Sequence, residues 1–387
     1  MSECKGIEKE LCQKKNDCIW TNGTKRQYCR TKKNKKEVSI KNIQTENYIL
    51  LNYGKITNKK PIGGFDIDWT IIRPKSGKKM PKNKDDWMLM YENVPTTLME
   101  LSEEYQLVFI TNQKGLKTKE KQEDFIEKIN NIQMLLNIPL IVLISLKDGW
   151  YRKPFTGLYN VILDYLDRKQ DKKDFYCGDA AGREKDFANT DFGFAFNSRI
   201  IFFLPEQIFL DKEEQITITR PESLIKYIGE SNKITIPKEK KLCILMCGYQ
   251  GSGKSSLSTS LGIERISNDI QGSLAKTKKK ARSLMDKEQS FIIDNVNHTR
   301  LRRKMWIDMA REKSYKTMII WVDNNIEFCY YMNQLRCELS KGEIKIIPKV
   351  AYSTTRKYFE EPKESESDFF IKYTTMVKGY DYLFMLI

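Results

Sequence analysis

The fold is decided by the stretch Leu242-Cys-Ile-Leu-Met-Cys-Gly248-Tyr-Gln-Gly251-Ser252-Gly253-Lys254-Ser255. Its apolar beginning is too short for a buried helix and indicates a buried strand, and the residues after the glycines are compatible with a helix. Glycine, four residues and then Gly-Lys-Ser is the pattern of a phosphate-binding loop. The sequence therefore predicts a parallel α/β domain whose strand-to-helix turn binds a nucleotide.

The residues of this loop have distinct expected roles. Glycines allow backbone N–H groups to converge on an anion, and the following helix directs the positive end of its dipole at the same phosphates. Lys254 is expected to reach the β- and γ-phosphates, and the Ser255 hydroxyl is expected to bind Mg²⁺. The predicted nucleotide-binding residues are Gly248, Gly251, Ser252, Gly253, Lys254 and Ser255.

Two acids follow where later strands should end. Asp269 is placed to accept the proton of an attacking hydroxyl. A helix cap is the alternative for Asp269, because Gly272 and a lysine-rich helix follow it. Asp294 ends the apolar run that starts at Ser290, and it resembles the acid that steadies Mg²⁺ in phosphate-loop enzymes. We therefore expect two strand-end carboxylates to serve one nucleotide site.

An earlier strand also ends in carboxylates. Pro61-Ile-Gly-Gly-Phe leads directly into Asp66, and Asp68 follows two residues later. Neighbouring carboxylates repel each other, so a counter-cation is expected, and Mg²⁺ suits oxygen ligands. Asp-x-Asp is a common pattern on its own, and a solvated strand end is the alternative.

Three later stretches make this carboxylate pair more specific. They are Leu107-Val-Phe-Ile-Thr111-Asn-Gln-Lys-Gly, Tyr151-Arg-Lys153-Pro and Phe175-Tyr-Cys-Gly-Asp179-Ala-Ala-Gly-Arg, with Asp186 and Asp191 shortly after. An Asp-x-Asp, a strand-end threonine, a lysine and a distal aspartate in this order form the constellation of haloacid-dehalogenase-type phosphatases. The combination of Thr-Asn-Gln-x-Gly, Arg-Lys-Pro and Gly-Asp-Ala-Ala-Gly-Arg further resembles the phosphatase half of polynucleotide kinase 3′-phosphatases.

This resemblance implies a role for each position. Asp66 would be the nucleophile that forms an aspartyl-phosphate. Asp68 would protonate the leaving hydroxyl and then activate water. Thr111 would hold phosphate oxygens, and Lys153 would neutralise charge during transfer. Asp179 would share Mg²⁺ with Asp66 and the main-chain carbonyl of Asp68.

The second half of the chain resembles the kinase half of the same family, through Asp294-Asn-x-Asn and the amphipathic helix after it. In that family a lid supplies an arginine to the transferring phosphate, and Arg336 is the candidate here, with a surface arginine as the alternative. Arg303 is the candidate for binding the phosphate of the incoming strand, with a solvated helix arginine as the alternative. The resemblance covers about residues 48–387.

Two residues depart from the family pattern. Trp69 stands where the family usually has glycine, and Asn268 stands where related kinases often have arginine. The Trp69 indole would either narrow the entrance and stack on a nucleobase, or distort the turn and weaken activity. We expect activity to be retained because every charged role is still filled.

Composition restricts the class of partner. The 387 residues carry a net charge of +16, which favours a polyanion such as nucleic acid, with a lysine-rich coding bias as the alternative. A single histidine, His298, argues against His-rich zinc sites and Ser-His-Asp hydrolysis. No apolar run is long enough to span a bilayer and no signal peptide is recognised. We expect an intracellular, soluble protein of the nucleus or cytoplasm, or of a viral factory if the gene is viral.

The cysteines fall into two groups. The first lies in a basic segment too poor in aliphatic residues for a core and comprises Cys4, Cys12, Cys18 and Cys29. A cysteine-stapled module and a disordered basic tail are the alternatives there, and no Cys-x-x-Cys pair supports a zinc site. The spacing is similar to short cysteine modules in some proteins of large cytoplasmic DNA viruses. The later cysteines are expected to be core thiols, and they include Cys243, Cys247, Cys329 and Cys337.

We divide the chain into a cysteine-rich module (1–40), a haloacid-dehalogenase-like phosphatase (41–210), a linker (211–237) and a P-loop kinase (238–387), with a parallel sheet in each α/β domain. The resemblance implies an enzyme that removes a 3′-phosphate and transfers the γ-phosphate of ATP to a 5′-hydroxyl. Its expected cofactors are Mg²⁺ and ATP, its expected substrates are DNA nicks, gaps and ends, with RNA left open, and a ligase is expected to act next. The alternatives are an RNA-repair or small-molecule phosphatase with an accessory ATPase, and a non-catalytic nucleic-acid scaffold.

Overall fold

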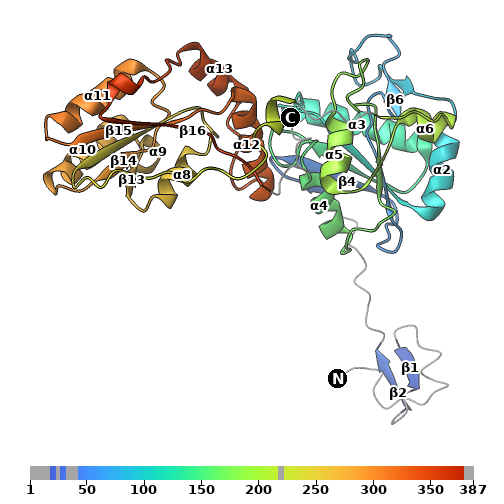
Figure 1. Cartoon of the computed structure of the whole chain (residues 1–387). Helices are drawn as coiled ribbons and strands as arrows, with labels where there is room; N and C mark the ends of the chain where they lie inside the picture. Colours follow the sequence, from blue (N-terminus) through green and yellow to red (C-terminus); the bar gives the residue numbers. More distant parts are fainter. Residues whose placement is uncertain (1–17, 23–26, 32–41, 217–221, 379–387) are drawn as a thin grey trace. The chain divides into compact units, whose positions relative to one another are not determined.

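A computed structural model describes residues 18–22, 27–31, 42–216 and 222–378. The chain forms two compact units, Met1–Lys41 and Asn42–Ile387. In the first unit, β1 (Cys18–Asn22) pairs antiparallel with β2 (Gln27–Thr31) (Figure 1). Two of the four amino-terminal cysteines, Cys4 and Cys12, lie outside the described residues.

The second unit begins with a seven-stranded sheet of order β11-β10-β5-β8-β9-β4-β3. Its strands are β3 (Ile43–Gln44), β4 (Tyr48–Tyr53), β5 (Ile62–Phe65), β8 (Gln106–Asn112), β9 (Leu140–Ser145), β10 (Phe175–Cys177) and β11 (Ile201–Phe203). From β11 to β9 neighbouring strands are parallel, whereas β4 is antiparallel to β9 and β3 is antiparallel to β4. The apolar runs predicted to end at Asp66 and Thr111 are β5 and β8.

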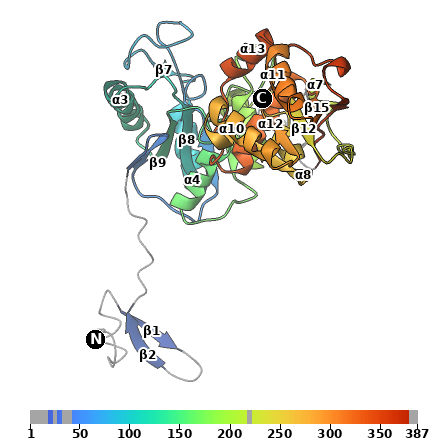
Figure 2. The same ribbon diagram turned by 90° about the vertical axis from the view of Figure 1, so that its left-hand side faces the viewer.

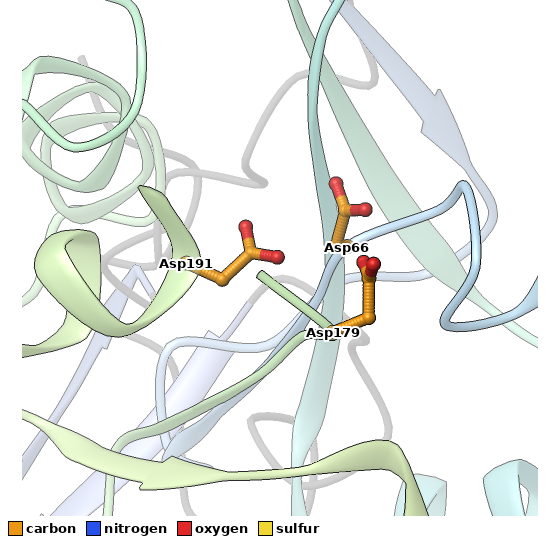
Figure 3. Close-up of side chains that lie close together, drawn as sticks. All are labelled: Asp66, Asp179 and Asp191. Carbon is orange, nitrogen blue, oxygen red and sulfur yellow. The ribbon is translucent and has the colours of Figure 1, made fainter. Parts of the chain in front are cut away.

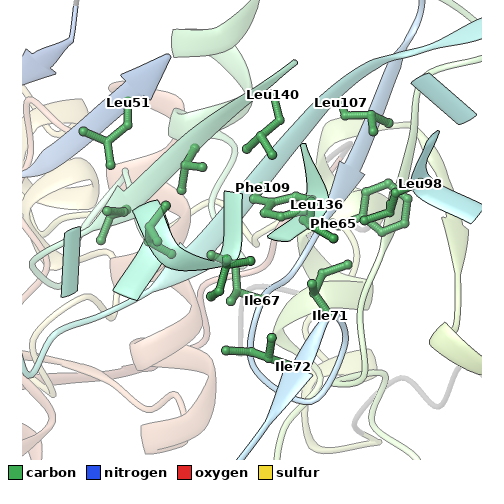
Figure 4. Close-up of a cluster of buried hydrophobic side chains, with 14 of the residues drawn as sticks. Leu51, Phe65, Ile67, Ile71, Ile72, Leu98, Leu107, Phe109, Leu136 and Leu140 are labelled. Carbon is green, nitrogen blue, oxygen red and sulfur yellow. The ribbon is translucent and has the colours of Figure 1, made fainter. Parts of the chain in front are cut away.

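Helices cover both faces of this sheet. They are α2 (Val94–Glu104), α3 (Lys119–Leu136), α4 (Gly157–Tyr165), α5 (Thr190–Ser198) and α6 (Pro205–Leu210). Leu98 of α2 and Leu136 of α3 pack with Phe65 and Phe109 of the sheet, as Figure 4 shows. On the opposite face, α4 and α5 contribute their own buried apolar side chains. A short antiparallel ribbon of β6 (Ile72–Arg73) and β7 (Met88–Leu89) follows the end of β5.

A second sheet, of order β13-β14-β12-β15-β16, is entirely parallel. Its strands are β12 (Leu242–Cys247), β13 (Glu264–Ile266), β14 (Phe291–Ile293), β15 (Lys316–Val322) and β16 (Phe369–Tyr373). Its helical elements are α8 (Lys254–Ser260), α9 (Asn268–Gln271), α10 (Leu274–Asp286), α11 (Arg300–Arg311), α12 (Ile326–Leu339), α13 (Lys349–Lys357) and the 3₁₀ helix η1 (Glu364–Glu366). Two α/β regions, the first with a mainly parallel sheet and the second with an entirely parallel one, therefore confirm the predicted α/β fold class.

The helices of this region also lie on both faces of their sheet. Ala281 and Leu284 of α10 pack with Trp306 of α11 on one face. Leu257 of α8 packs on the other face, against Ile244 of β12. Figure 2, turned by 90° from Figure 1, shows α8 and α10 of this region from another side. Residues 248–253 connect the carboxyl end of β12 to the start of α8.

The segment predicted to be a linker, residues 211–237, contains the short helix α7 (Glu222–Ile225). Leu224 of α7 is fully buried, and the Tyr227 ring packs in a tilted arrangement against Phe328 of α12, with 4.3 Å between the ring centroids. Part of this segment therefore packs against the helices that follow β15. The boundaries at 210 and 237 stay a prediction.

Five cysteines of the two α/β regions are free and buried. They are Cys177, Cys243, Cys247, Cys329 and Cys337. Burial raises the pKa of each of these thiols, which keeps them protonated and unreactive. The expectation that the later cysteines are core thiols is confirmed.

Candidate active sites

The first candidate site lies at the carboxyl end of the seven-stranded sheet. Asp66 follows β5, Thr111 lies near the end of β8, and Asp179 follows β10. Because β10, β5 and β8 are parallel neighbours, their carboxyl ends meet at one edge. The structure thus brings together three residues that the sequence places far apart.

A third acid joins Asp66 and Asp179. Asp191, in the first turn of α5, has a carboxylate oxygen within 4.8 Å of oxygens of the other two acids; Figure 3 shows the three carboxylates gathered. A Cβ at Gly178 would lie 2.4 Å from Asp191 Oδ2, so only glycine permits this approach. Asp191 had no predicted role, because an acid at a helix start has the same local pattern as a dipole-stabilising residue.

Lys153 lies among these acids. Its Nζ is 2.6 Å from Asp66 Oδ1, 2.7 Å from Asp191 Oδ1 and 2.7 Å from the Tyr176 hydroxyl, and it also donates to the Ile110 carbonyl at 2.9 Å. Burial alone would lower the pKa of Lys153, but Asp191 and Asp66 together raise it. Lys153 therefore remains a cation and fixes the orientation of Asp66.

One ammonium does not balance three carboxylates. Burial raises the pKa of Asp66 well above its usual range, although Lys153 acts in the opposite direction. Burial, with the charge of Asp191, also raises the pKa of Asp179 to about 7. Crowded carboxylate oxygens with an excess of negative charge are the donor set that Mg²⁺ prefers. The residues present therefore fit a divalent cation.

Asp68 is held by two side chains from other elements. Gln113 Nε2 donates to Asp68 Oδ2 at 2.8 Å and also to Thr111 Oγ1 at 3.0 Å. Lys128 Nζ lies 3.3 Å from Asp68 Oδ1, and the Lys128 side chain is only 4% exposed. Lys128 lies on the face of α3 that also buries Phe125 and Ile129. A lysine on the apolar face of a predicted helix is the signal that could have found it.

Trp69 has a left-handed backbone conformation, with φ of 64°. Its N–H donates to the Ile72 carbonyl at 2.7 Å, and its indole Nε1 donates to the Lys79 carbonyl at 3.3 Å. The turn after Asp68 is thus closed with tryptophan in a conformation that favours glycine. The bulky residue imposes backbone strain without opening the turn.

The second candidate site lies at the carboxyl end of β12. Gly251 and Gly253 have φ of 73° and 95°, and a Cβ on Gly251 would lie 2.4 Å from the Cys329 carbonyl oxygen. Lys254 is 7% exposed, and its Nζ donates to the Tyr249 carbonyl at 2.5 Å. Burial lowers the pKa of Lys254, and the charge of Arg336 acts in the same direction. A bound polyphosphate would supply the counter-charge that this lysine needs.

The predicted acids lie beside this loop, because β13, β14 and β12 are adjacent. Asp294 follows β14, is 7% exposed, and pairs with Arg265 at 3.0 Å. Asp269 is exposed in α9. The neighbouring Asn268 donates its main-chain N–H to Asn295 Oδ1 at 2.9 Å. The helix-capping alternative for Asp269 is not supported, since Ser267 is the residue that caps α9.

Arg336 lies on α12, the helix whose Cys329 carbonyl faces Gly251 of the same loop. Its Nη2 is 3.5 Å from Asn333 Oδ1. Its Nε is buried and has no hydrogen-bond acceptor among the residues that the structure describes. A buried guanidinium N–H that lacks an acceptor can bind a ligand oxygen. The geometry is compatible with the predicted role of Arg336.

The expectation for Arg303 is wrong. Its guanidinium is fully buried, and it binds Glu366 through Nε at 2.8 Å and Nη2 at 2.9 Å. Its Nη1 donates to the Asn297 and Glu360 carbonyls at 3.1 and 2.8 Å. The hydrogen-bonding groups of Arg303 are occupied inside the protein, so this arginine cannot contact a nucleic acid. The solvated-arginine alternative is also wrong.

No helix in the described part of the chain combines the length and the apolar character needed to cross a membrane.

Comparison with known proteins gives concordant matches. The family model described as polynucleotide kinase 3 phosphatase matches residues 61–209. The chain is 32% identical over 333 residues to the bifunctional polynucleotide phosphatase/kinase of Schizosaccharomyces pombe, covering 83% of this chain and 81% of that protein. It is 28% identical over 382 residues to an Acanthamoeba polyphaga mimivirus protein whose name pairs the same two activities, covering 84% and 87%. The polynucleotide 3′-phosphatase of Saccharomyces cerevisiae is 26% identical over 203 residues, covering 38% of this chain and 85% of that protein.

Proposed function

Because the chain belongs to the family of bifunctional polynucleotide phosphatase/kinases, we propose that it repairs the ends of broken nucleic-acid strands with two separate active sites. One site removes a 3′-phosphate and the other phosphorylates a 5′-hydroxyl, which leaves the ends that a ligase joins. The observation that carries the proposal is the convergence of Asp66, Lys153 and Asp179 at one sheet edge, in a chain that also has a complete phosphate loop. DNA nicks, gaps and ends are the proposed substrates.

At the first site, Asp66 acts as the nucleophile. Lys153 binds Asp66 Oδ1, which leaves Oδ2 to attack phosphorus while the bond from phosphorus to the 3′-oxygen breaks. Asp68 gives its proton to that oxygen, and it then takes a proton from the water that hydrolyses the aspartyl-phosphate. Thr111 and Lys153 bind the phosphoryl oxygens. The products are a 3′-hydroxyl and inorganic phosphate.

At the second site, the loop around Lys254 holds the phosphates of ATP through its backbone N–H groups. Asp269 accepts the proton of the 5′-hydroxyl as its oxygen attacks the γ-phosphorus, and ADP leaves. Lys254 and Arg336 bind oxygens of the transferred group. The products are a 5′-phosphate and ADP.

Mg²⁺ is the proposed metal in both sites. Asp66, Asp179 and the Asp68 carbonyl would hold it in the first site, and Ser255 with Asp294 would hold it in the second. The ion supplies positive charge against the phosphate oxygens.

A nicked duplex with a 3′-phosphate and a 5′-hydroxyl tests the two activities together. Incubation with ATP and Mg²⁺ should convert both ends, and the product should become a substrate for a ligase. The same ends on RNA, and mononucleotide 3′-phosphates, test the alternative of an RNA-repair or small-molecule phosphatase. If neither end changes on DNA or RNA, the enzyme assignment fails and a non-catalytic scaffold replaces it.

Replacing Lys128 by Met should lower kcat of the 3′-phosphatase about 10- to 100-fold and leave KM unchanged, because a side chain that orients a catalytic group acts on the chemical step. The kinase should keep its activity. Steady-state assays of both reactions check this. Lys128→Arg should restore part of the loss, and Lys121→Met, an exposed lysine of the same helix, is the matched control. A purely structural role would instead lower both activities together.

Replacing Trp69 by Gly should leave kcat of the phosphatase within about threefold of wild type, because the turn already has the conformation of glycine. Loss of a stacked base should raise KM for an oligonucleotide 3′-phosphate by roughly tenfold or more, without raising KM for a mononucleotide. Trp69→Phe keeps both the ring and the strain, and it should behave like wild type. A KM for the oligonucleotide that stays at the wild-type value in Trp69→Gly would exclude stacking.

A further inference from the structure

Helix α10 carries an unusual concentration of positive charge. Five cations lie within residues 276–282, and they are Lys276, Lys278, Lys279, Lys280 and Arg282. Three of them, Lys276, Lys279 and Arg282, are exposed. They are spaced three residues apart, so they follow one side of the helix with about 4.5 Å of rise between neighbours. We call these three residues the α10 stripe.

The α10 stripe is electrostatically unfavourable for the free protein. Like charges three and four residues apart on a helix repel each other, and a cation in the first turn opposes the positive end of the helix dipole. The first turn of α10 has no acid. Lys280 pairs with Glu264 at 3.3 Å, but the stripe residues form no ion pair within the described part of the chain. A bound anion would relieve this repulsion.

The start of α10 is fixed beside the second active site. Thr277, on the buried side of the helix, donates to Asn268 Oδ1 at 3.0 Å, and Asp269 is the next residue along the chain. At the other end of α10, Asp286 pairs with Lys313, just before β15, at 3.1 Å. The helix therefore runs from the carboxyl edge of the sheet, where Asp269 lies, toward the amino edge. Figure 1 shows α10 beside α9 and the strands β13 and β14.

We propose that the α10 stripe binds the backbone phosphates of the strand whose 5′-hydroxyl is presented to Asp269. This inference rests on the proposed kinase function and adds the path of its substrate. A row of lysine and arginine matches a phosphodiester backbone, which has one charge per nucleotide in a regular series. Such contacts position a strand and read no base sequence, as an enzyme that acts on any broken end requires. The strand therefore leaves the site along α10.

Neutralising the stripe tests the proposal. The variant is Lys276→Gln, Lys279→Gln and Arg282→Gln together. The control replaces Lys233, Lys238 and Lys240, exposed residues before the amino end of β12, by Gln. Binding of a single strand of about 16 nucleotides with a 5′-hydroxyl is measured by fluorescence anisotropy at several salt concentrations. Kinase KM is measured for the same strand and for a dinucleotide.

The stripe variant should bind the long strand roughly tenfold more weakly near physiological salt, and the slope of log affinity against log salt should fall by about two, because three phosphate contacts are lost. KM for the dinucleotide and for ATP, kcat, and the 3′-phosphatase rate should match wild type. The control variant should keep the wild-type slope. The melting temperature of the stripe variant should not fall, since mutual repulsion has been removed.

Two results would overturn the proposal. One is equal loss of affinity and slope in the stripe and control variants, which would mean that only net charge matters. The other is an unchanged slope combined with loss of binding to polyglutamate, which would assign the stripe to an acidic protein. If wild type phosphorylates no 5′-hydroxyl, the kinase function fails, but the anisotropy slopes still report directly on the stripe.

Discussion

Replacing Asp66 by Asn should abolish removal of the 3′-phosphate, with a loss on the order of 10⁴-fold or more in kcat, because an amide cannot form the aspartyl-phosphate. Asparagine has nearly the same volume, and Lys153 keeps its partner Asp191 at 2.7 Å, so the fold should survive. Phosphorylation of the 5′-hydroxyl should continue at the wild-type rate. Both reactions are followed on the nicked duplex, with the exposed Asp85→Asn as control.

Trapping of the intermediate sharpens this test. Wild type quenched in acid during turnover of a ³²P-labelled 3′-phosphate should carry label on the protein, and Asp66→Asn should carry none. Labelled Asp66→Asn protein would place the nucleophile on another residue. Retention of full phosphatase activity by the variant would remove Asp66 from the mechanism.

Replacing Lys254 by Met should lower kinase kcat about 10²- to 10³-fold or more, because the charge that stabilises the transferring phosphoryl group is lost. Removal of the 3′-phosphate should be unaffected. The Lys254 side chain is buried, and burial lowers its pKa. The charged ammonium is therefore destabilised in the folded protein until a nucleotide binds. Methionine should therefore leave the unfolding midpoint unchanged or raise it.

Calorimetry with ATP separates binding from chemistry in this variant. Lys254→Met should bind ATP more weakly than wild type, whereas Lys287→Met, an exposed lysine after α10, should bind it normally. If Lys254→Met loses the 3′-phosphatase as well, the two activities share a site and the assignment to separate sites is wrong.

Strands could be predicted from the sequence where a short apolar run leads directly into a residue of a candidate site. The apolar runs that end at Asp66, Thr111 and Asp294 are strands β5, β8 and β14, because a buried parallel strand is a continuous apolar run. The antiparallel edge was not predictable. Strand β4 pairs with β9, more than eighty residues later, and no local pattern reports such a distant partner.

The same limit applies to the candidate sites. Asp66 directly follows β5, and Asp179 follows β10 after one residue, so their meeting follows from parallel order alone. Lys128 meets Asp68 across 60 residues, and its part in the site depends on which face of α3 is buried. Arg303 was misassigned for a related reason, since its burial depends on Glu366, 63 residues later. Side-chain partners that are brought together by tertiary packing cannot be recognised from a short stretch of sequence around either residue.

One buried cysteine in each half of the chain can report how often the sheet around it opens. Cys177 lies in β10 of the first sheet, and Cys243 lies in β12 of the second, each without exposed surface. A thiol reagent can reach them only when the surrounding sheet opens, so the rate of their alkylation in native protein measures that opening. Mass spectrometry of the peptides that contain Cys177 and Cys243 would give the two opening rates separately. Their comparison would show whether heat or a mutation that opens one half also opens the other. Bound ATP should slow the alkylation of Cys243. If the two halves open independently, the alkylation rate of Cys177 should not change.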